Sequence, residues 1–168
     1  MTNLETLKQQ TADMEAKLKE MEAEIERLEN GWEMKCPYKE GDEYWLLTHF
    51  GGFQKMEWTN NLFDGIVSVQ GNTFPTEEAI ILEIKRRNLL TRFRAFRDEC
   101  NDNWKPKWHD NKPKYFLFFN ANDKELQIDC SFNYINLHYF GYFENAEDAE
   151  RAITLFGQEI IDLFVECE

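Results

Sequence analysis

The chain is 168 residues long, 15% of its residues are aromatic, and 32 acidic against 19 basic residues give it a formal net charge of -13. This length is enough to bury one real hydrophobic core and to carry a separate extended element, whereas the overall charge repels nucleic acid. Because no apolar run has the length of a membrane span or the form of a signal peptide, we expect a cytoplasmic protein without a membrane partner.

Nothing in the sequence marks a catalytic or metal-binding site. The cysteines are far apart and form no C-x-x-C pair, which predicts reduced thiols rather than a zinc site or a disulfide framework. The three histidines belong to no metalloprotease or nucleophile motif, and no glycine-rich phosphate loop is present. We therefore expect a protein that is not an enzyme and that uses no cofactor and no metal.

Residues 1–30 have the spacing of a coiled-coil helix. Apolar residues occupy the a and d positions of a heptad without a slip, with Thr11 as the polar exception and Trp32 continuing the pattern. Such a narrow stripe is too thin to fold alone, so we expect self-association into a dimer or a higher oligomer. The predicted oligomerisation residues are Leu4, Leu7, Met14, Leu18, Met21, Ile25 and Leu28.

The charges beside this stripe leave the helix orientation open. In a parallel pair Lys17 at g attracts Glu22 at e, but Glu24 and Glu29 repel each other. An antiparallel pair, a higher oligomer, docking on a foreign helix and folding back on the chain's own domain remain alternatives. Asn30-Gly31 is a typical helix stop, so the helix is predicted to end there.

After a linker at 31–42, residues 43–168 read as one α+β domain. Strands are predicted at 43–48, 53–58 and 66–70, followed by a helix that Thr76 caps and that runs to about Arg97. Further strands are predicted at 115–119, 126–132 and 137–143, followed by a helix from about Asn145. The predicted order is βββα-βββα, with two helices packed on a mostly antiparallel sheet.

The carboxy-terminal region is the most acidic part of the chain. Residues 115–168 carry 11 acidic and 2 basic side chains. Carboxylates on the outer face of a helix can stand in for phosphates on the surface of a nucleic-acid enzyme, although simple solubility explains them equally well. The predicted partner-binding carboxylates are Glu147, Asp148, Glu150, Glu159 and Asp162.

The middle of the chain is its only net basic stretch. Residues 77–114 carry 10 basic and 7 acidic side chains, and Trp104 and Trp108 lie among them. Tryptophan and arginine dominate protein-binding hot spots, so we add Trp104, Trp108 and Arg94 to the predicted partner-binding residues. The same residues suit single-stranded nucleic acid, but pairing of the arginines within the domain is the favoured reading and direct nucleic-acid binding the less favoured one.

Several short motifs resemble a group of phage proteins. They are Glu43-Tyr44-Trp45, Trp58, Asp64, Gly71-Asn72-Thr73-Phe74, Thr76-Glu77-Glu78-Ala79, Trp104-Lys105-Pro106-Lys107-Trp108, Tyr142-Phe143 and residues 147–153. Over residues 38–165 the chain is similar to small accessory proteins encoded by bacteriophages and prophages. The resemblance implies a phage-derived protein in the cytoplasm of a bacterial host, and it brings no catalytic residues.

Small acidic phage proteins, anti-CRISPR proteins among them, commonly block host defence complexes. Together with the acidic carboxy-terminal region, the resemblance therefore implies an oligomeric inhibitor that occludes a nucleic-acid-processing or defence complex of the host. A single-strand nucleic-acid-binding protein and a structural component of a phage particle are the alternatives.

Overall fold

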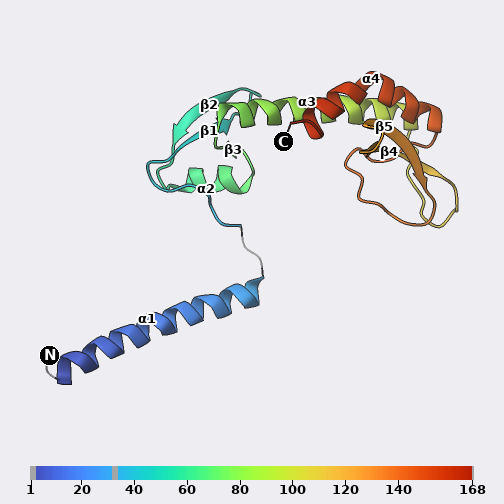
Figure 1. Ribbon diagram of the computed structural model, residues 1–168. Coiled ribbons are helices and arrows are strands. Elements are labelled where there is room, and N and C mark those ends of the chain that lie inside the picture. The colour runs from blue at the N-terminus through green and yellow to red at the C-terminus, as the bar shows by residue number, and fades with distance from the viewer. Residues whose placement is uncertain (1–2, 32–33, 168) are drawn as a thin grey trace. The chain divides into compact units, whose positions relative to one another are not determined.

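The computed structural model describes residues 3–31 and 34–167 and shows an α+β fold, as expected (Figure 1). Its helices are α1 (Asn3–Asn30), α2 (Leu62–Val69), α3 (Glu77–Asn101) and α4 (Ala146–Phe164). Its strands are β1 (Glu43–Leu47), β2 (Phe53–Glu57), β3 (Thr73–Phe74), β4 (Lys114–Asn120) and β5 (Glu125–Ser131). Within the described ranges, no helix is both long enough and apolar enough to span a membrane.

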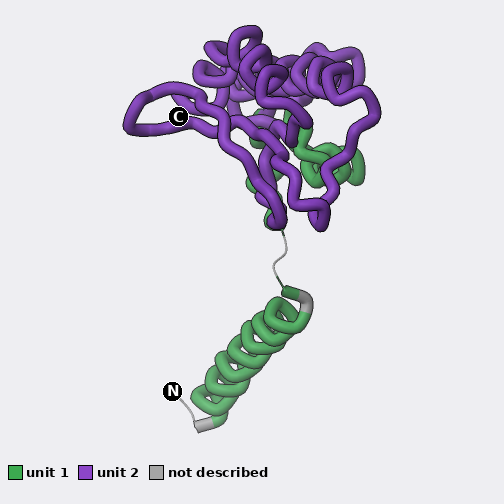
Figure 2. Tube along the Cα trace, turned by 90° about the vertical axis from the view of Figure 1, so that its right-hand side faces the viewer, with its two compact units in different colours: residues 1–43, 57–72 green, residues 44–56, 73–168 purple. Residues whose placement is uncertain are grey.

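The chain divides into two compact units (Figure 2). Residues 1–43 and 57–72 form the first unit, which contains α1 and α2. Residues 44–56 and 73–168 form the second, which contains α3, α4 and the β4–β5 pair. The first unit thus holds the predicted coiled-coil helix, and the second holds all the predicted partner-binding residues.

Helix α1 matches the predicted amino-terminal helix. It ends at Asn30, and Gly31 follows with φ of 76°, a left-handed conformation that glycine adopts without steric cost. Every side chain from Leu4 to Glu29 is exposed. Trp32, the last position of the predicted heptad pattern, lies outside the described residues.

The predicted strand at 66–70 is wrong, because this segment belongs to helix α2. Asn61 and Asp64 form a capping box: the amide of Asp64 donates to the Asn61 side chain at 2.9 Å, and the amide of Asn61 donates to the Asp64 carboxylate at 3.4 Å. These bonds start a helix through residues whose β-branched side chains favoured a strand. The third strand is instead β3, which pairs antiparallel with β1 in the order β2-β1-β3.

The predicted strand at 137–143 is also wrong. Seven residue pairs join β4 to β5, but only Phe143 of the later segment pairs with this hairpin, through two backbone hydrogen bonds with Tyr115 at 3.0 and 2.8 Å. Gly141 turns the chain at φ of 77° just before Phe143, so the preceding residues form a loop. The order is therefore α-ββ-α-β-α-ββ-α rather than βββα-βββα, with two antiparallel sheets in place of one.

Helices α3 and α4 build the core of the second unit. The hydroxyl of Thr76 accepts the amide of Ala79 at 3.2 Å, as expected of the predicted cap, and α3 continues to Asn101, past the predicted end near Arg97. Helix α4 packs along α3 and against both strands of the β4–β5 pair (Figure 1). The buried residues at this junction are Leu89, Phe93, Leu117, Phe143, Ala149, Ala152, Phe156, Ile160 and Leu163.

Candidate functional site

The predicted oligomerisation residues form an apolar seam along α1. We define the seam as the seven predicted apolar side chains together with Thr11; the exposed fractions of the seven lie between 54% and 70%. The Thr11 hydroxyl donates to the carbonyl of Leu7 at 2.9 Å, so its polar group is satisfied within the helix. A water-exposed stripe of this kind is suited to pairing with another helix.

The five predicted carboxylates of α4 differ in whether they form an ion pair within the domain. Arg151 donates to Asp148 at 2.8 Å, and Arg92 of α3 pairs with Glu159 at 2.5 Å. Glu147, Glu150 and Asp162 are exposed and form no ion pair with another described residue, and Asp162 accepts only a hydrogen bond from Gln158 at 2.8 Å. We call these three side chains the acidic face; they are the part of the predicted set that can attract a cationic partner.

A cleft of about 490 Å³ lies where the last turn of α3 meets two loops. The residues lining it include Arg97, Asn101, Trp104, Lys105, Gly141 and Tyr142. Trp104 is half-buried and Lys105 is exposed, so the cleft combines an aromatic surface with a free ammonium group. The predicted residue Trp104 therefore helps to form this concave surface.

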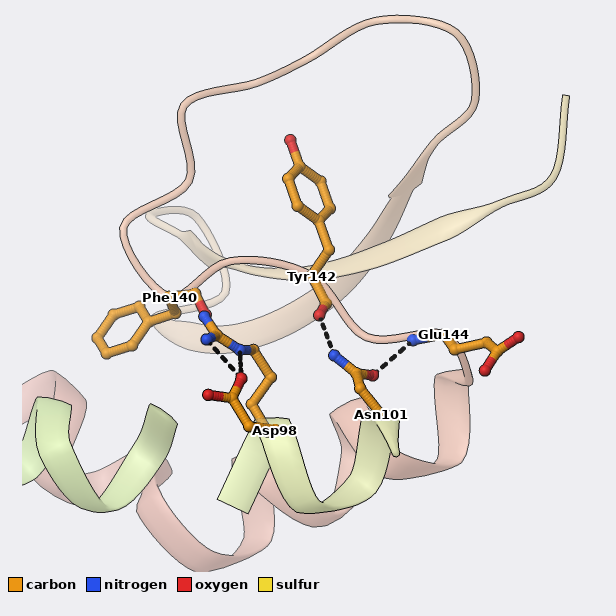
Figure 3. Close-up of polar contacts among 6 residues, drawn as sticks. Asp98, Asn101, Phe140, Tyr142 and Glu144 are labelled. Atoms are coloured by element: carbon orange, nitrogen blue, oxygen red, sulfur yellow. Dashed lines mark hydrogen bonds and ion pairs between the residues drawn. The ribbon is translucent and has the colours of Figure 1, made fainter. Parts of the chain in front are cut away.

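Asn101 fixes the loop on one side of this cleft. Its side-chain amide donates to the carbonyl of Tyr142 at 2.9 Å, and its side-chain oxygen accepts the amide of Glu144 at 3.0 Å (Figure 3). The residue is only 8% exposed. The side-chain nitrogen and the side-chain oxygen of Asn101 thus both hold the backbone that leads from the loop into α4.

Arg97 holds the same loop one turn earlier in α3. Its guanidinium donates to the carbonyl of Phe140 at 3.1 Å and to Asp98 at 2.9 and 2.6 Å. Gly141 lies so close that a Cβ atom there would stand 2.5 Å from Nη1 of Arg97, and its φ is +77°. The left-handed backbone favours glycine at this position, and a side chain there would also displace the end of the Arg97 side chain.

Trp108, the second predicted tryptophan, lies outside the cleft. Its ring meets Tyr142 edge-on at 5.1 Å, and the ammonium of Lys114 lies 5.5 Å from its centre. Lys114 is fully buried and donates to Asp110 and to the carbonyls of Lys112 and Phe132, at 2.7 to 3.0 Å. The hydrogen bond from Lys114 lowers the pKa of the Asp110 carboxyl. Trp108 is half-buried like Trp104 but packs on Tyr142 and Lys114 instead of lining the cleft, so the two tryptophans do not form a joint platform.

His138 lies in the loop that precedes α4, and its side chain is packed against the domain. Its ring stacks on Phe116 with centroids 3.7 Å apart, and its Nε2 atom is buried without a hydrogen-bond partner. Burial lowers the pKa of His138 below its ordinary value of 6.5, so the ring is neutral at pH 7. This environment is that of a structural histidine.

The basic stretch is largely engaged within the domain. Arg86 donates to the carbonyl of Leu163 at 2.7 Å, Arg87 pairs with Glu83 at 2.7 Å, and Arg92 and Arg97 make the contacts described above. Arg94, the predicted partner-binding arginine, is exposed on α3. Most of the arginines thus have acceptors inside the domain, which limits the positive charge available to a nucleic acid.

The sequence does not predict the residues that shape the cleft. Arg97 is predicted only as the approximate end of a helix in the basic stretch, and neither Asn101 nor Gly141 is among the predicted site residues. Two signals were present in the sequence. Asn101 lies just after the predicted end of the helix near Arg97, a position where asparagine commonly caps or anchors the chain. Gly141 lies between aromatic residues, and an isolated glycine in a strand-like run indicates a turn or a close approach.

Three surfaces of the described chain thus remain as candidates: the seam of α1, the acidic face of α4 and the cleft beside Asn101. The first suits a helix, the second a cationic surface, and the third a small planar or anionic group. Comparison with known proteins adds no further assignment, because no family model, no curated protein and no solved structure matches the chain.

Proposed function

We propose that the chain is a non-catalytic, phage-encoded binding protein of the bacterial cytoplasm. It self-associates through α1 and blocks a nucleic-acid-processing or defence complex of the host, such as a CRISPR complex, by occlusion. The observation that carries this proposal is the exposed seam of α1. In a single chain this apolar stripe stays in contact with water, which is unfavourable. The phage origin rests on the resemblance of residues 38–165 described above.

Energetics support self-association. Burying one leucine, isoleucine or methionine side chain contributes about 1.5–3 kcal/mol, and the seam carries seven such residues with exposed fractions of at least 54%. An isolated helix with an uncovered stripe gains little from its own backbone bonds, because helix nucleation is costly. Pairing of two such helices therefore stabilises both the assembly and the helix itself.

The acidic face supports occlusion of a host enzyme. Glu147, Glu150 and Asp162 are exposed on one helix, within a region of 11 acidic and 2 basic residues. A surface that binds nucleic acid is rich in lysine and arginine, and carboxylates on a rigid helix compete with phosphates for it. Because this attraction acts between solvated charges, we expect it to weaken as salt concentration rises.

A plasmid-interference assay tests the proposal. The full chain is expressed in bacterial strains that each carry one nucleic-acid-targeting defence system, and transformation by a targeted plasmid is counted. In at least one strain we expect the chain to raise transformation about tenfold or more. The triple variant Glu147→Lys, Glu150→Lys and Asp162→Lys is expected to lose this effect, because it reverses the charge of the acidic face.

A matched variant separates the acidic face from net charge. Glu77→Lys, Glu78→Lys and Glu99→Lys change three exposed carboxylates of α3 and shift the net charge by the same amount. We expect this control to protect the plasmid as the unmodified chain does. The proposed mode of inhibition is wrong if no strain responds, or if both triple variants protect equally well.

The cleft favours a second candidate, binding of single-stranded nucleic acid. It brings the ring of Trp104 and the ammonium of Lys105 into one concave surface, the combination on which a base stacks while its phosphate is paired. Arg97, the other basic residue that lines the cleft, is already engaged by Asp98 and by the carbonyl of Phe140. We therefore rank this candidate below inhibition.

A fluorescence titration with a labelled single-stranded oligonucleotide in moderate salt tests this second candidate. If the cleft binds bases, Trp104→Leu is expected to weaken binding about tenfold, since stacking contributes about 1–3 kcal/mol per base. Trp104→Phe keeps an aromatic ring and is expected to retain most of the affinity. Absence of binding by the unmodified chain would refute the candidate.

A further inference from the structure

We infer that the occupant of the α1 seam is α1 of a second copy, paired in the antiparallel orientation. This inference rests on the self-association proposed above and adds its geometry. The sequence left both orientations open. The charge along α1, its register and the polar residue of the seam together distinguish them.

The negative charge of α1 is concentrated in its last eleven residues, 20–30. Residues 1–19 carry three basic and three acidic side chains, whereas residues 20–30 carry one basic and five acidic side chains. A parallel pair places two copies of this acidic segment side by side. An antiparallel pair centred on residue 16 instead places residues 20–30 beside residues 3–12 of the second copy, which carry one acidic and one basic side chain, and so avoids this repulsion.

The helix dipoles act in the same direction. Glu26 and Glu29 lie in the last turns of α1, where the partial negative charge of the carboxyl end disfavours acidic side chains, and Arg27 is engaged by Glu24 at 2.6 Å. In an antiparallel pair the amino-terminal end of the second helix, with its partial positive charge, lies beside these carboxylates. A parallel pair instead adds a second negative end.

The residues of the seam also match one another in an antiparallel pair. Its eight positions from Leu4 to Leu28 are arranged symmetrically about residue 16, so that each a residue faces a d residue of the partner from end to end. The polar Thr11 then faces a methionine, Met21, rather than a second Thr11. Because the Thr11 hydroxyl is already bonded to the carbonyl of Leu7, it can pack against this flexible thioether without an unsatisfied group.

The flanking e positions make the inference testable. In an antiparallel pair the e residues of the two helices face each other, which brings Lys8 beside Glu22 and Glu29 of the second copy. In a parallel pair e residues face g residues, so Lys8 meets only the neutral Asn3, and Lys17 meets Glu22. The two orientations therefore differ in which lysine contacts which glutamate.

Zero-length cross-linking of the unmodified full chain reads out this difference. An equal mixture of ¹⁵N-labelled and unlabelled protein is treated with a carbodiimide, which joins a lysine amine to an adjacent carboxylate, and mixed-isotope peptides identify links between chains. We expect links from Lys8 to Glu29 or Glu22. Lys8 and Glu29 are 21 positions apart on one helix, about 31 Å, so a single helix cannot form the first link.

A pair of charge variants provides an independent measurement. Lys8→Glu is expected to raise the dissociation constant about tenfold, since it places acidic side chains opposite each other at the e positions. Lys19→Glu makes the same change in charge at a b position, away from the interface, and is expected to have a much smaller effect. Sedimentation equilibrium at several protein concentrations gives both constants.

The outcomes separate the orientation from self-association itself. An associated protein whose links between chains join Lys17 to Glu22, or that shows none from Lys8, overturns the antiparallel inference and leaves the proposed self-association standing. A protein that sediments as a single chain overturns both. Equal effects of Lys8→Glu and Lys19→Glu would likewise contradict the antiparallel contact.

Discussion

Replacing Leu18 and Ile25 by aspartate is expected to convert the assembled protein to single chains. Both residues lie at a positions near the middle and end of the seam, and each is 54% exposed in the single chain. In a coiled coil these positions are buried, and a carboxylate there is removed from water without a partner. We expect the dissociation constant to rise about a thousandfold or more, measured by light scattering and sedimentation.

The helix offers a matched control at its opposite face. Ala16→Asp and Ala23→Asp add the same two charges at f positions, which point away from the seam in either orientation. This variant is expected to keep the assembled mass. If the seam variant also keeps it, the assembly does not use α1, and the functional proposal loses the observation that carries it.

The elements that sequence reasoning predicted correctly are those in which independent signals agree. Thr76 combines a cap residue with acidic residues in the following turn, and α3 begins as predicted. The segment at 66–70 offered only a short run with β-branched residues, which does not distinguish a strand from a helix. The decisive feature was the capping box of Asn61 and Asp64, which precedes the run and is easily overlooked.

The surfaces were predictable to different degrees. The seam of α1 follows from local spacing alone, so its residues could be named from the sequence. The cleft could not, because its frame joins residues distant in the chain: Asn101 and Tyr142 are 41 positions apart, and Arg97 and Phe140 are 43 apart. Composition also suggested a joint role for Trp104 and Trp108, whereas the packing of Trp108 on Tyr142 assigns them different environments.

Asn101→Ala is expected to lower the free energy of unfolding by about 2–3 kcal/mol. The substitution removes both hydrogen bonds of a residue that is 8% exposed and leaves the carbonyl of Tyr142 and the amide of Glu144 without their partner. The loop before α4 then loses one of its attachments to α3. Urea unfolding followed by tryptophan fluorescence measures the loss, at one protein concentration for all variants.

Two further variants assign this loss to the hydrogen bonds. Asn88→Ala, on an exposed position of the same helix, is expected to leave stability unchanged or slightly raised, because alanine is the better helix former. Asn101→Asp keeps an acceptor for the amide of Glu144 but sets a carboxylate against the carbonyl of Tyr142. Hydrogen exchange at Glu144 should therefore accelerate in Asn101→Ala and stay slow in Asn101→Asp, although both proteins are destabilised. Equal stability of Asn101→Ala and Asn88→Ala would show that the loop is held by Arg97 and the aromatic packing alone.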